Sequence, residues 1–305
     1  MKPVYRRVSV KSPMSSANLS AGFDVMGVAL DAYYDELDIE LDISSSSLEV
    51  ISNVPLPDDN TARKAAELFY KKLGRVIGTR IFLRKGIPAG MGLGSSGASA
   101  AGVAFGLNLA FGSPLKLEEL IDIAARSEKS PHADNVSASI LGGFAIVHSR
   151  EPYSAFSIYR DWKFMLIIPN EEPPADKTAK LRMALGEPVP FELYVQEKFA
   201  YNSLLKGLLY DDRVSFGMGM NLESYHQIVR GRSGLYDAYY RLKNRILEAG
   251  ALGVCISGAG PSILVLPGEN TKLFEIEKIV ADMGINAKVI ESRVSKGVEK
   301  IKVEM

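Results

Sequence analysis

The chain has 305 residues, of which 47% are hydrophobic, so it is long enough to bury the core of two domains or of one large domain. Its 36 Lys and Arg residues balance its 36 Asp and Glu residues. The chain therefore has no excess of positive charge that would favour binding to nucleic acid or to an anionic membrane. The single cysteine, Cys255, excludes an intramolecular disulfide and a multi-cysteine zinc site. Because Cys255 lies in the apolar run Leu252–Ile256, we expect a buried and inert thiol.

The sequence shows no signal for export or for membrane insertion. The first residues, Met1–Arg7, lack the apolar run of a signal peptide. No stretch approaches the roughly 18 consecutive apolar residues of a membrane span. We therefore expect a soluble, cytoplasmic protein that binds neither nucleic acid nor membranes.

Hydrophobic periodicity predicts mixed strands and helices in the first half of the chain. The capping residue Asn60 and the start signal Pro114 mark the beginnings of two of the helices. We expect strands at Val4–Val10, Glu36–Asp42, Ile81–Lys85 and Phe144–His148, and helices at Asn60–Phe69, Ser96–Phe111, Leu115–Glu128 and Asp134–Leu141.

The polar segment Ser149–Asp161 is predicted to be irregular and to hold a domain boundary, so we divide the chain into residues 1–155 and 156–305. The second half then predicts a β-α-β-β-α-β arrangement, which makes the chain α+β. Its expected elements are strands at Lys163–Pro169, Val254–Ile256, Ser262–Leu266 and Ala287–Ser292, and helices at Asp176–Leu185, Phe191–Leu209, Tyr236–Ala249 and Thr271–Met283.

The most informative segment is the glycine-rich run Gly90–Ala101, which follows the strand at Ile81–Lys85 and opens a helix. Glycine lets backbone N–H groups approach a ligand, and a helix N-terminus favours an anion. The run is not a Walker A loop, because Gly94 precedes Ser95 where that loop needs a lysine, and it lacks the Rossmann spacing. Two interpretations stay open at this point: a phosphate-binding loop, or a glycine turn packed closely on a helix.

Two further loops have the composition of a site. Pro13–Asp24 is rich in small polar residues and carries one amide and one carboxylate. Ser257–Ser262 is a glycine loop between two apolar strands. Each alone is compatible with an ordinary turn, but three such loops in one chain favour a common site.

In these three places the chain resembles the GHMP kinase superfamily. Pro13–Asp24 is similar to its P-x-x-S-x-N-L…G-F-D segment, Pro88–Ala100 to its P-x-G-x-G-L-G-S-S loop, and Ser257–Ser262 to its S-G-x-G-P-[ST] segment. The order and spacing of the motifs span nearly the whole chain. Pro131–Val136 resembles the P-H-P-D-N segment of the homoserine kinase branch, although Ala133 replaces a proline, and Ser20 and Ala21 replace a usual Gly-Pro pair.

The resemblance implies a two-domain GHMP kinase fold, with an ATP-binding N-terminal domain of the ribosomal-protein-S5 type and a ferredoxin-like C-terminal domain. It implies ATP and Mg²⁺ as cofactors and phosphorylation of the L-homoserine side-chain hydroxyl on the route to threonine. Two alternatives stay open: another small-molecule kinase of the superfamily, acting on mevalonate, shikimate or a sugar, and a catalytically inactive nucleotide-binding sensor. Members of the family are often dimeric, which leaves a homodimer as an expectation.

The resemblance also assigns residues to ATP and to a metal. Ser96 and Glu128 are the expected Mg²⁺ ligands, although Glu128 could equally be a solvated acid at the end of a helix. Asn60 could be a plain N-cap as well as an adenine contact, and Lys85 a solvated lysine at the end of a strand. The expected ATP-binding residues are Asn60, Lys85, Pro88, Gly90, Met91, Gly92, Leu93, Gly94, Ser95 and Ser96.

A zwitterionic amino-acid substrate requires acceptors for its ammonium and donors for its carboxylate. Asp24 and Asp134 suit the ammonium, and Arg182 and Arg230 suit the carboxylate because a guanidinium forms a bidentate fork. The expected substrate-binding residues are Asn18, Asp24, His132, Asp134, Asn135, Arg182, Arg230, Gly258 and Gly260, and the expected catalytic residues are Asn135, Asp134, Arg182 and Thr178. No residue is an obvious general base. We favour a mechanism in which Asn135 orients the hydroxyl, and keep Asp134 as base as the alternative.

Overall fold

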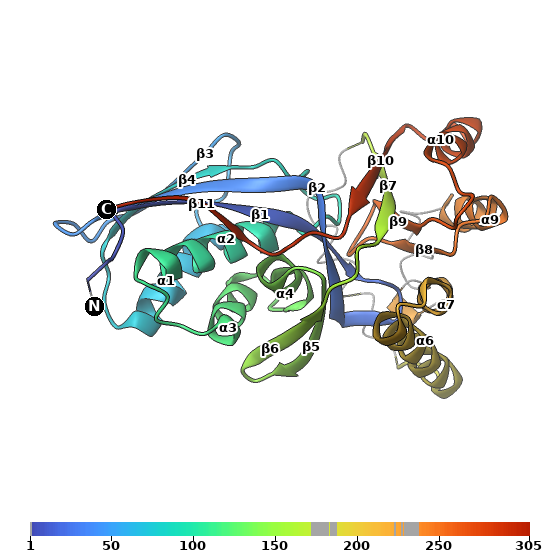
Figure 1. The fold of residues 1–305 in the computed structure, drawn as a ribbon, viewed down its shortest axis with the longest axis horizontal. Coiled ribbons are helices and arrows are strands. Elements are labelled where there is room, and N and C mark those ends of the chain that lie inside the picture. The colour runs from blue at the N-terminus through green and yellow to red at the C-terminus, as the bar shows by residue number, and fades with distance from the viewer. Residues whose placement is uncertain (1, 172–182, 184–187, 223, 227, 229–237) are drawn as a thin grey trace.

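The computed structural model describes residues 2–171, 183, 188–222, 224–226, 228 and 238–305. Its strands, in chain order, are β1 (Arg7–Asn18), β2 (Gly22–Asp42), β3 (Leu48–Ser52), β4 (Gly78–Arg84), β5 (Phe144–Arg150), β6 (Tyr153–Ile158), β7 (Lys163–Pro169), β8 (Gly253–Ile256), β9 (Ile263–Leu266), β10 (Ala287–Arg293) and β11 (Glu299–Glu304). Its helices are α1 (Thr61–Leu73), α2 (Ser95–Ala110), α3 (Leu117–Ser127), α4 (Asp134–Leu141), α6 (Phe191–Tyr210), α7 (Arg213–Asn221), α9 (Tyr239–Glu248) and α10 (Leu273–Asp282). Figure 1 shows these elements as two sheets with their helices.

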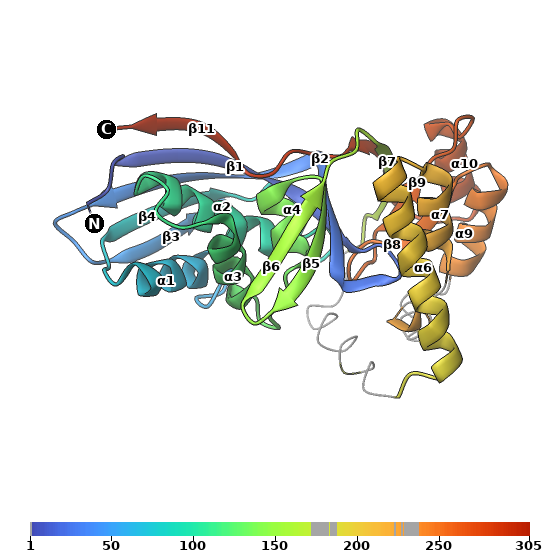
Figure 2. The same ribbon diagram turned by 60° about the horizontal axis from the view of Figure 1, so that its bottom comes forward.

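The N-terminal sheet has the strand order β11-β1-β2-β4-β3, and β5 and β6 extend it from β2. Helices α1 to α4 cover one of its faces (Figures 1 and 2). The alternation expected in Glu36–Asp42 is confirmed, because Leu37, Ile39 and Leu41 are buried against these helices while the acidic residues between them are less buried. A period of two on a sheet that is covered on one face fixes the register of the strand.

The second sheet is antiparallel with the order β10-β7-β9-β8, which confirms the β-α-β-β-α-β prediction. It is buried on both faces. Met165 and Ile167 of β7 pack with α9 and α10, whereas Phe164 and Leu166 pack with α6, α7 and the tip of the β1–β2 hairpin. This second core therefore joins the two halves of the molecule and brings the hairpin tip to the second sheet.

Most predicted elements are confirmed within a few residues at their ends, but three segments differ. The strand expected at Glu36–Asp42 begins 14 residues earlier, because β2 runs from Gly22 to Asp42. Pro13–Asn18, expected as part of a loop, continues β1, and only residues 19–21 separate it from β2. Small buried side chains allow this, because Ser15 and Ser16 pair with Ala29 and Val28 inside the sheet. Ser149–Asp161, expected to be irregular, contains β6, which pairs with β5.

Three other elements were not predicted from the sequence: β3, α7 and β11. Of these, β11 pairs with β1, so the end of the chain returns to the N-terminal sheet. We propose that the domain boundary falls between β6 and β7 and that β11 belongs to the first domain. The predicted helix Asp176–Leu185 lies outside the described residues except for Met183. Among the helices that the structure describes, none is both long and apolar enough to cross a bilayer.

Candidate active site

The first glycine loop connects β4 to α2, in the predicted order of strand, loop and helix. Gly90, Gly92 and Gly94 have φ values of 73°, 77° and 69°, a left-handed conformation that favours glycine. Gly94 is the N-cap of α2 and offers no side chain to cap the helix. The first N–H groups of α2 therefore have no intrahelical partner, which is the arrangement that binds phosphate at helix N-termini.

The second glycine loop, Ser257–Ser262, lies directly against the first. The hydroxyl of Ser257 donates to the carbonyl of Gly92 at 2.8 Å, and the amide of Ser262 donates to the carbonyl of Met91 at 3.2 Å. A Cβ on Gly92 would lie 2.2 Å from the carbonyl oxygen of Ser257 and 2.6 Å from the amide nitrogen of Gly260. The two backbones thus approach more closely than any other residue at position 92 would permit.

The hairpin between β1 and β2 contacts both loops. The amide of Ser15 donates to the carbonyl of Leu93 at 3.2 Å, and the hydroxyls of Ser257 and Ser16 are 2.8 Å apart. At the tip, the Asn18 amide nitrogen donates to the carbonyl of Gly258 at 3.0 Å. The three motifs, far apart in sequence, therefore form one interlocked cluster.

Asn18 and Asp24 lie on this hairpin tip. The Oδ1 atom of Asn18 accepts from the Asp24 amide at 3.2 Å, and both residues have a positive φ, 73° and 59°. Asn18 is buried and links two loops, whereas Asp24 is only partly buried. Asn18 therefore connects the first motif to the second glycine loop. Asp24 lies at the same hairpin tip and is partly exposed to solvent.

The start of α4 brings His132, Asp134 and Asn135 to the first loop. The Nδ1 atom of His132 lies 2.7 Å from Oδ1 of Asp134, which also accepts the Asn135 amide at 2.8 Å. The Asn135 side chain donates to the Ser15 hydroxyl at 2.9 Å, and it lies 2.9 Å from the position of a Cβ built on Gly94. Asp134 is almost fully buried, so its carboxylate has a fixed position beside the first glycine loop.

Glu128 follows the last residue of α3, as predicted, and faces the first turn of α2. The Ser96 hydroxyl donates to its Oε2 at 3.0 Å. Its Oε1 is buried and has no hydrogen-bond partner among the residues that the structure describes. Burial raises the pKa of Glu128, opposed by the charge of His132 and the hydrogen bond from Ser96. A buried carboxylate oxygen without a donor fits a cation, and Mg²⁺ prefers hard oxygen ligands with several waters.

The described residues hold no cluster of three or more His, Cys, Asp or Glu side chains that could bind a metal by themselves. The pair of Ser96 and Glu128 is compatible with a magnesium ion that takes its other ligands from phosphate oxygens and water. The alternative of a fully solvated Glu128 is wrong, because its carboxylate is held by Ser96 and half-enclosed.

Two predicted ATP contacts have structural partners. Asn60 caps α1, with its Oδ1 accepting the Arg63 amide at 3.0 Å, which confirms the N-cap and is compatible with a contact to adenine. Lys85 is not a solvated lysine at the end of a strand. Its side chain is 8% exposed and is paired with Asp35, with further bonds to Ser95 and Ser99. The alternative of a solvated lysine is therefore wrong, and a place for Lys85 beside the nucleotide stays a prediction.

The remaining predicted residues divide into three groups. Pro88 lies partly buried between β4 and the glycines of the first loop. Met91 and Leu93 are buried, so only their backbone is available to a ligand. Thr178, Arg182 and Arg230 lie outside the described residues. Ser15, Ser16 and Ser257 join the cluster although the sequence analysis assigned them no role. Their position inside the matched motifs was the only available signal.

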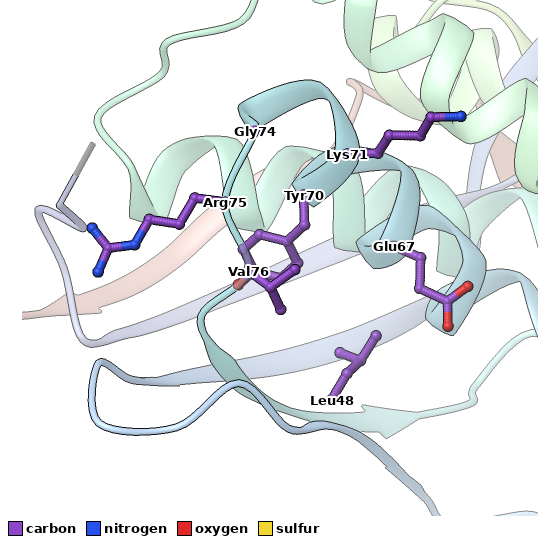
Figure 3. Close-up of a pocket in the computed structure, with 7 residues that line it drawn as sticks. All are labelled: Leu48, Glu67, Tyr70, Lys71, Gly74, Arg75 and Val76. Atoms are coloured by element: carbon purple, nitrogen blue, oxygen red, sulfur yellow. The ribbon is translucent and has the colours of Figure 1, made fainter.

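A shallow pocket of about 430 Å³ lies elsewhere on the molecule, beside the C-terminal end of α1 (Figure 3). None of the residues that line it belongs to the three motifs: Leu48, Glu67, Tyr70, Lys71, Gly74, Arg75 and Val76. The candidate active site is therefore defined by the convergence of motifs and not by this pocket.

Comparison with known proteins assigns the chain to a family. The family models of the GHMP kinase N-terminal and C-terminal domains match residues 60–143 and 204–286. The chain is 38% identical to a homoserine kinase of Thermoplasma volcanium, with 96% of each chain covered, and 33% identical to one of Saccharolobus solfataricus, with 93% and 95% covered. The chain thus belongs to the GHMP kinase family.

Within that family, the similarity is to homoserine kinases. The crystal structure of a homoserine kinase from Cytophaga hutchinsonii superposes with a TM-score of 0.85 at 28% identity, and 99% of both chains is covered. The two sequence relatives carry the same name. This agreement of sequence and fold over nearly the whole length confirms the predicted two-domain kinase architecture.

Proposed function

We propose that this chain transfers the γ-phosphoryl group of ATP to the side-chain hydroxyl of L-homoserine, with Mg²⁺ as the metal. The observation that carries the proposal is the convergence of three motifs around the N-terminus of α2, with the buried Oε1 of Glu128 beside it. The homoserine kinases that resemble the chain over 93% or more of its length support the choice of acceptor.

The role of the first loop is to hold phosphate oxygens with backbone amides. Ser95 and Ser96 begin α2, and the left-handed glycines before them turn the chain so that the helix N-terminus is open. Ser96 and Glu128 would hold Mg²⁺, which when bound neutralises phosphate charge. Because phosphoryl transfer requires little nucleophile activation, positioning and charge neutralisation supply most of the catalysis.

The acceptor would lie between the hairpin tip and the start of α4. Asp24 and Asp134 present carboxylates to an ammonium, and His132 holds Asp134 in place through its 2.7 Å contact. Asn135, whose side chain donates to the Ser15 hydroxyl, would orient the substrate hydroxyl. Arg182 and Arg230 would supply the donors for the substrate carboxylate, with Thr178 beside them, as the family resemblance implies.

A coupled assay of ADP release with homoserine, mevalonate, shikimate and galactose tests the function. We expect turnover with homoserine and none of comparable rate with the others. Silence with homoserine and turnover with another acceptor would assign the chain to a different kinase of the family. ATP binding without turnover on any acceptor would favour the nucleotide-binding sensor.

Replacement of Asp134 by asparagine separates its two candidate roles. As the ammonium partner, Asp134→Asn weakens homoserine binding and raises KM. As a general base, the same change leaves homoserine affinity intact and abolishes kcat. We expect the first result, because the buried Asp134 carboxylate already accepts bonds from its neighbours.

A further inference from the structure

We propose that the buried ion pair of Asp35 and Lys85 is a positioning pair, which ties the two ends of the first glycine loop together so that the loop is ready to bind ATP. The inference rests on the proposed function only in that ATP is the ligand. Neither side chain has to touch ATP, and the pair acts through the backbone of the loop.

The contacts of Asp35 hold the beginning of the loop. Its Oδ1 accepts the amides of Gly86 and Ile87 at 3.1 and 3.2 Å, at the point where the chain leaves β4. Its Oδ2 accepts from Lys85 Nζ and, at 2.8 Å, from the Ser99 hydroxyl. All the acceptor positions of this carboxylate that face the loop are therefore in use.

The contacts of Lys85 hold the end of the loop. Its Nζ donates to the carbonyl of Ser95 at 2.7 Å and to the Ser99 hydroxyl at 2.8 Å. Ser95 is the first residue of α2, and Ser99 follows one turn later. One ion pair thus connects residues 86–87 to residue 95, and the glycine-rich part of the loop lies between these two anchors.

The burial of the pair indicates that it serves to position the loop more than to stabilise the fold. Asp35 is 0% exposed and the Lys85 side chain 8% exposed. Burying two charges is costly, and a buried pair adds little stability over an apolar replacement of similar size. A fully bonded pair at this place fixes the two ends of a loop that contains three left-handed glycines, while the second glycine loop and the β1–β2 hairpin hold its middle. Preorganisation of this kind lowers the entropy that ligand binding has to offset.

The surface of the same two strands provides a matched control. Glu36 and Arg84 are paired across β2 and β4, one residue away from Asp35 and Lys85 along each strand, with a 3.2 Å contact between exposed side chains. Removing this pair also deletes one acid and one base from the chain. The contact of the Glu36–Arg84 pair is between these two side chains, and it involves neither end of the first glycine loop.

The test compares Asp35→Asn/Lys85→Met with Glu36→Gln/Arg84→Met. ATP affinity is measured by calorimetry, KM for ATP and for homoserine by steady-state kinetics, and stability by thermal unfolding. We expect the buried double variant to unfold within a few degrees of the parent chain, to bind ATP roughly tenfold or more weakly, and to show a smaller change in KM for homoserine. The control pair should change none of these values.

If the buried double variant fails to fold, Ser99→Ala decides the matter, because it removes a bond to both partners and leaves the charges paired. A measurable loss of ATP affinity in Ser99→Ala with kcat retained supports the proposal. Unchanged ATP affinity in a folded double variant, or in Ser99→Ala when the double variant is unfolded, overturns it. Absence of ATP binding by the parent chain would instead contradict the proposed function.

Discussion

The two glycine loops of the active site resemble each other in sequence but differ in what surrounds them. The first loop, Gly90–Gly94, opens a helix and lies beside Ser96 and Glu128, a pair that can hold a metal. The second loop, Ser257–Ser262, connects two antiparallel strands and directs Ser257 and its backbone at the first loop. Glycine at the start of α2 frees amide groups for a ligand, whereas Gly92, where the second loop packs against the first, lets two backbones meet. Chemistry is therefore expected to depend on the neighbours of the first loop, and loop geometry on the second.

The largest effect is expected from Glu128→Gln, which removes the charge beside the first loop. We predict a loss of turnover by about two or more orders of magnitude with the fold intact, because metal-dependent charge neutralisation provides much of phosphoryl-transfer catalysis. Steady-state kinetics across a range of Mg²⁺ concentrations checks it, with Glu118→Gln on the exposed side of α3 as control. Near-normal activity at ordinary Mg²⁺ would refute the metal assignment.

The next largest effect is expected where the two loops touch. A methyl group on Gly92 would meet the backbone of Ser257 at 2.2 Å, so Gly92→Ala must separate the loops, and KM for ATP should rise by roughly tenfold to a hundredfold. Gly74→Ala is the matched control, since Gly74 has a similar φ of 71° but nothing within 4 Å of the added Cβ. Equal effects of the two substitutions would mean that backbone strain alone, and not loop contact, explains the result.

A smaller effect is expected from Ser257→Ala, which removes the bonds to Gly92 and Ser16. Each lost hydrogen bond of this kind costs about 0.5–1.5 kcal/mol, and only the bond to Gly92 joins the two glycine loops, so ATP affinity should fall by no more than about tenfold. Ser203→Ala, which removes an exposed bond within α6, should leave affinity unchanged. A collapse of turnover with unchanged ATP affinity would mean that the second loop takes part in the chemistry, and would contradict its assignment to loop geometry alone.

The smallest effect is a change in stability with pH. Because burial raises the pKa of Glu128, its ionisation destabilises the folded state at neutral pH. Metal-free Glu128→Gln should therefore unfold at a slightly higher temperature than the parent chain at pH 7. This gain should fade as the pH falls through the raised folded-state pKa toward the ordinary glutamate value of 4.5. A gain that is independent of pH would point to packing instead of charge.

Much of the fold could be predicted because its elements have strong periodicity. The strand at Lys163–Pro169 and the helix at Asp134–Leu141 have the predicted bounds. The prediction of a buried thiol is also confirmed, since Cys255 is 0% exposed and burial raises its pKa to about 12. Short strands such as β3 and β11 gain their stability from pairing with distant strands, which local sequence does not reveal.

The site was harder to predict than the fold. The motifs identified the loops but not how they interlock, because contacts such as that of Ser257 with Gly92 join residues 165 positions apart. Lys85 shows the same limit. Its neighbours in sequence suggest a solvated lysine, and only the pairing of β2 with β4 brings the buried Asp35 to it. The cytoplasmic location and the homodimer stay predictions.

The central claim is that the interlocked motifs form one site for phosphoryl transfer to the homoserine side chain. Phosphorus and proton NMR of the purified product of ATP, Mg²⁺ and L-homoserine tests it most directly. We predict a phosphomonoester whose phosphorus couples to the side-chain methylene protons next to the oxygen, and about a hundredfold less of it, or lower still, in the same reaction time with Glu128→Gln. A phosphorylated carboxylate, release of inorganic phosphate alone, or the same yield of phosphomonoester with Glu128→Gln would contradict the account.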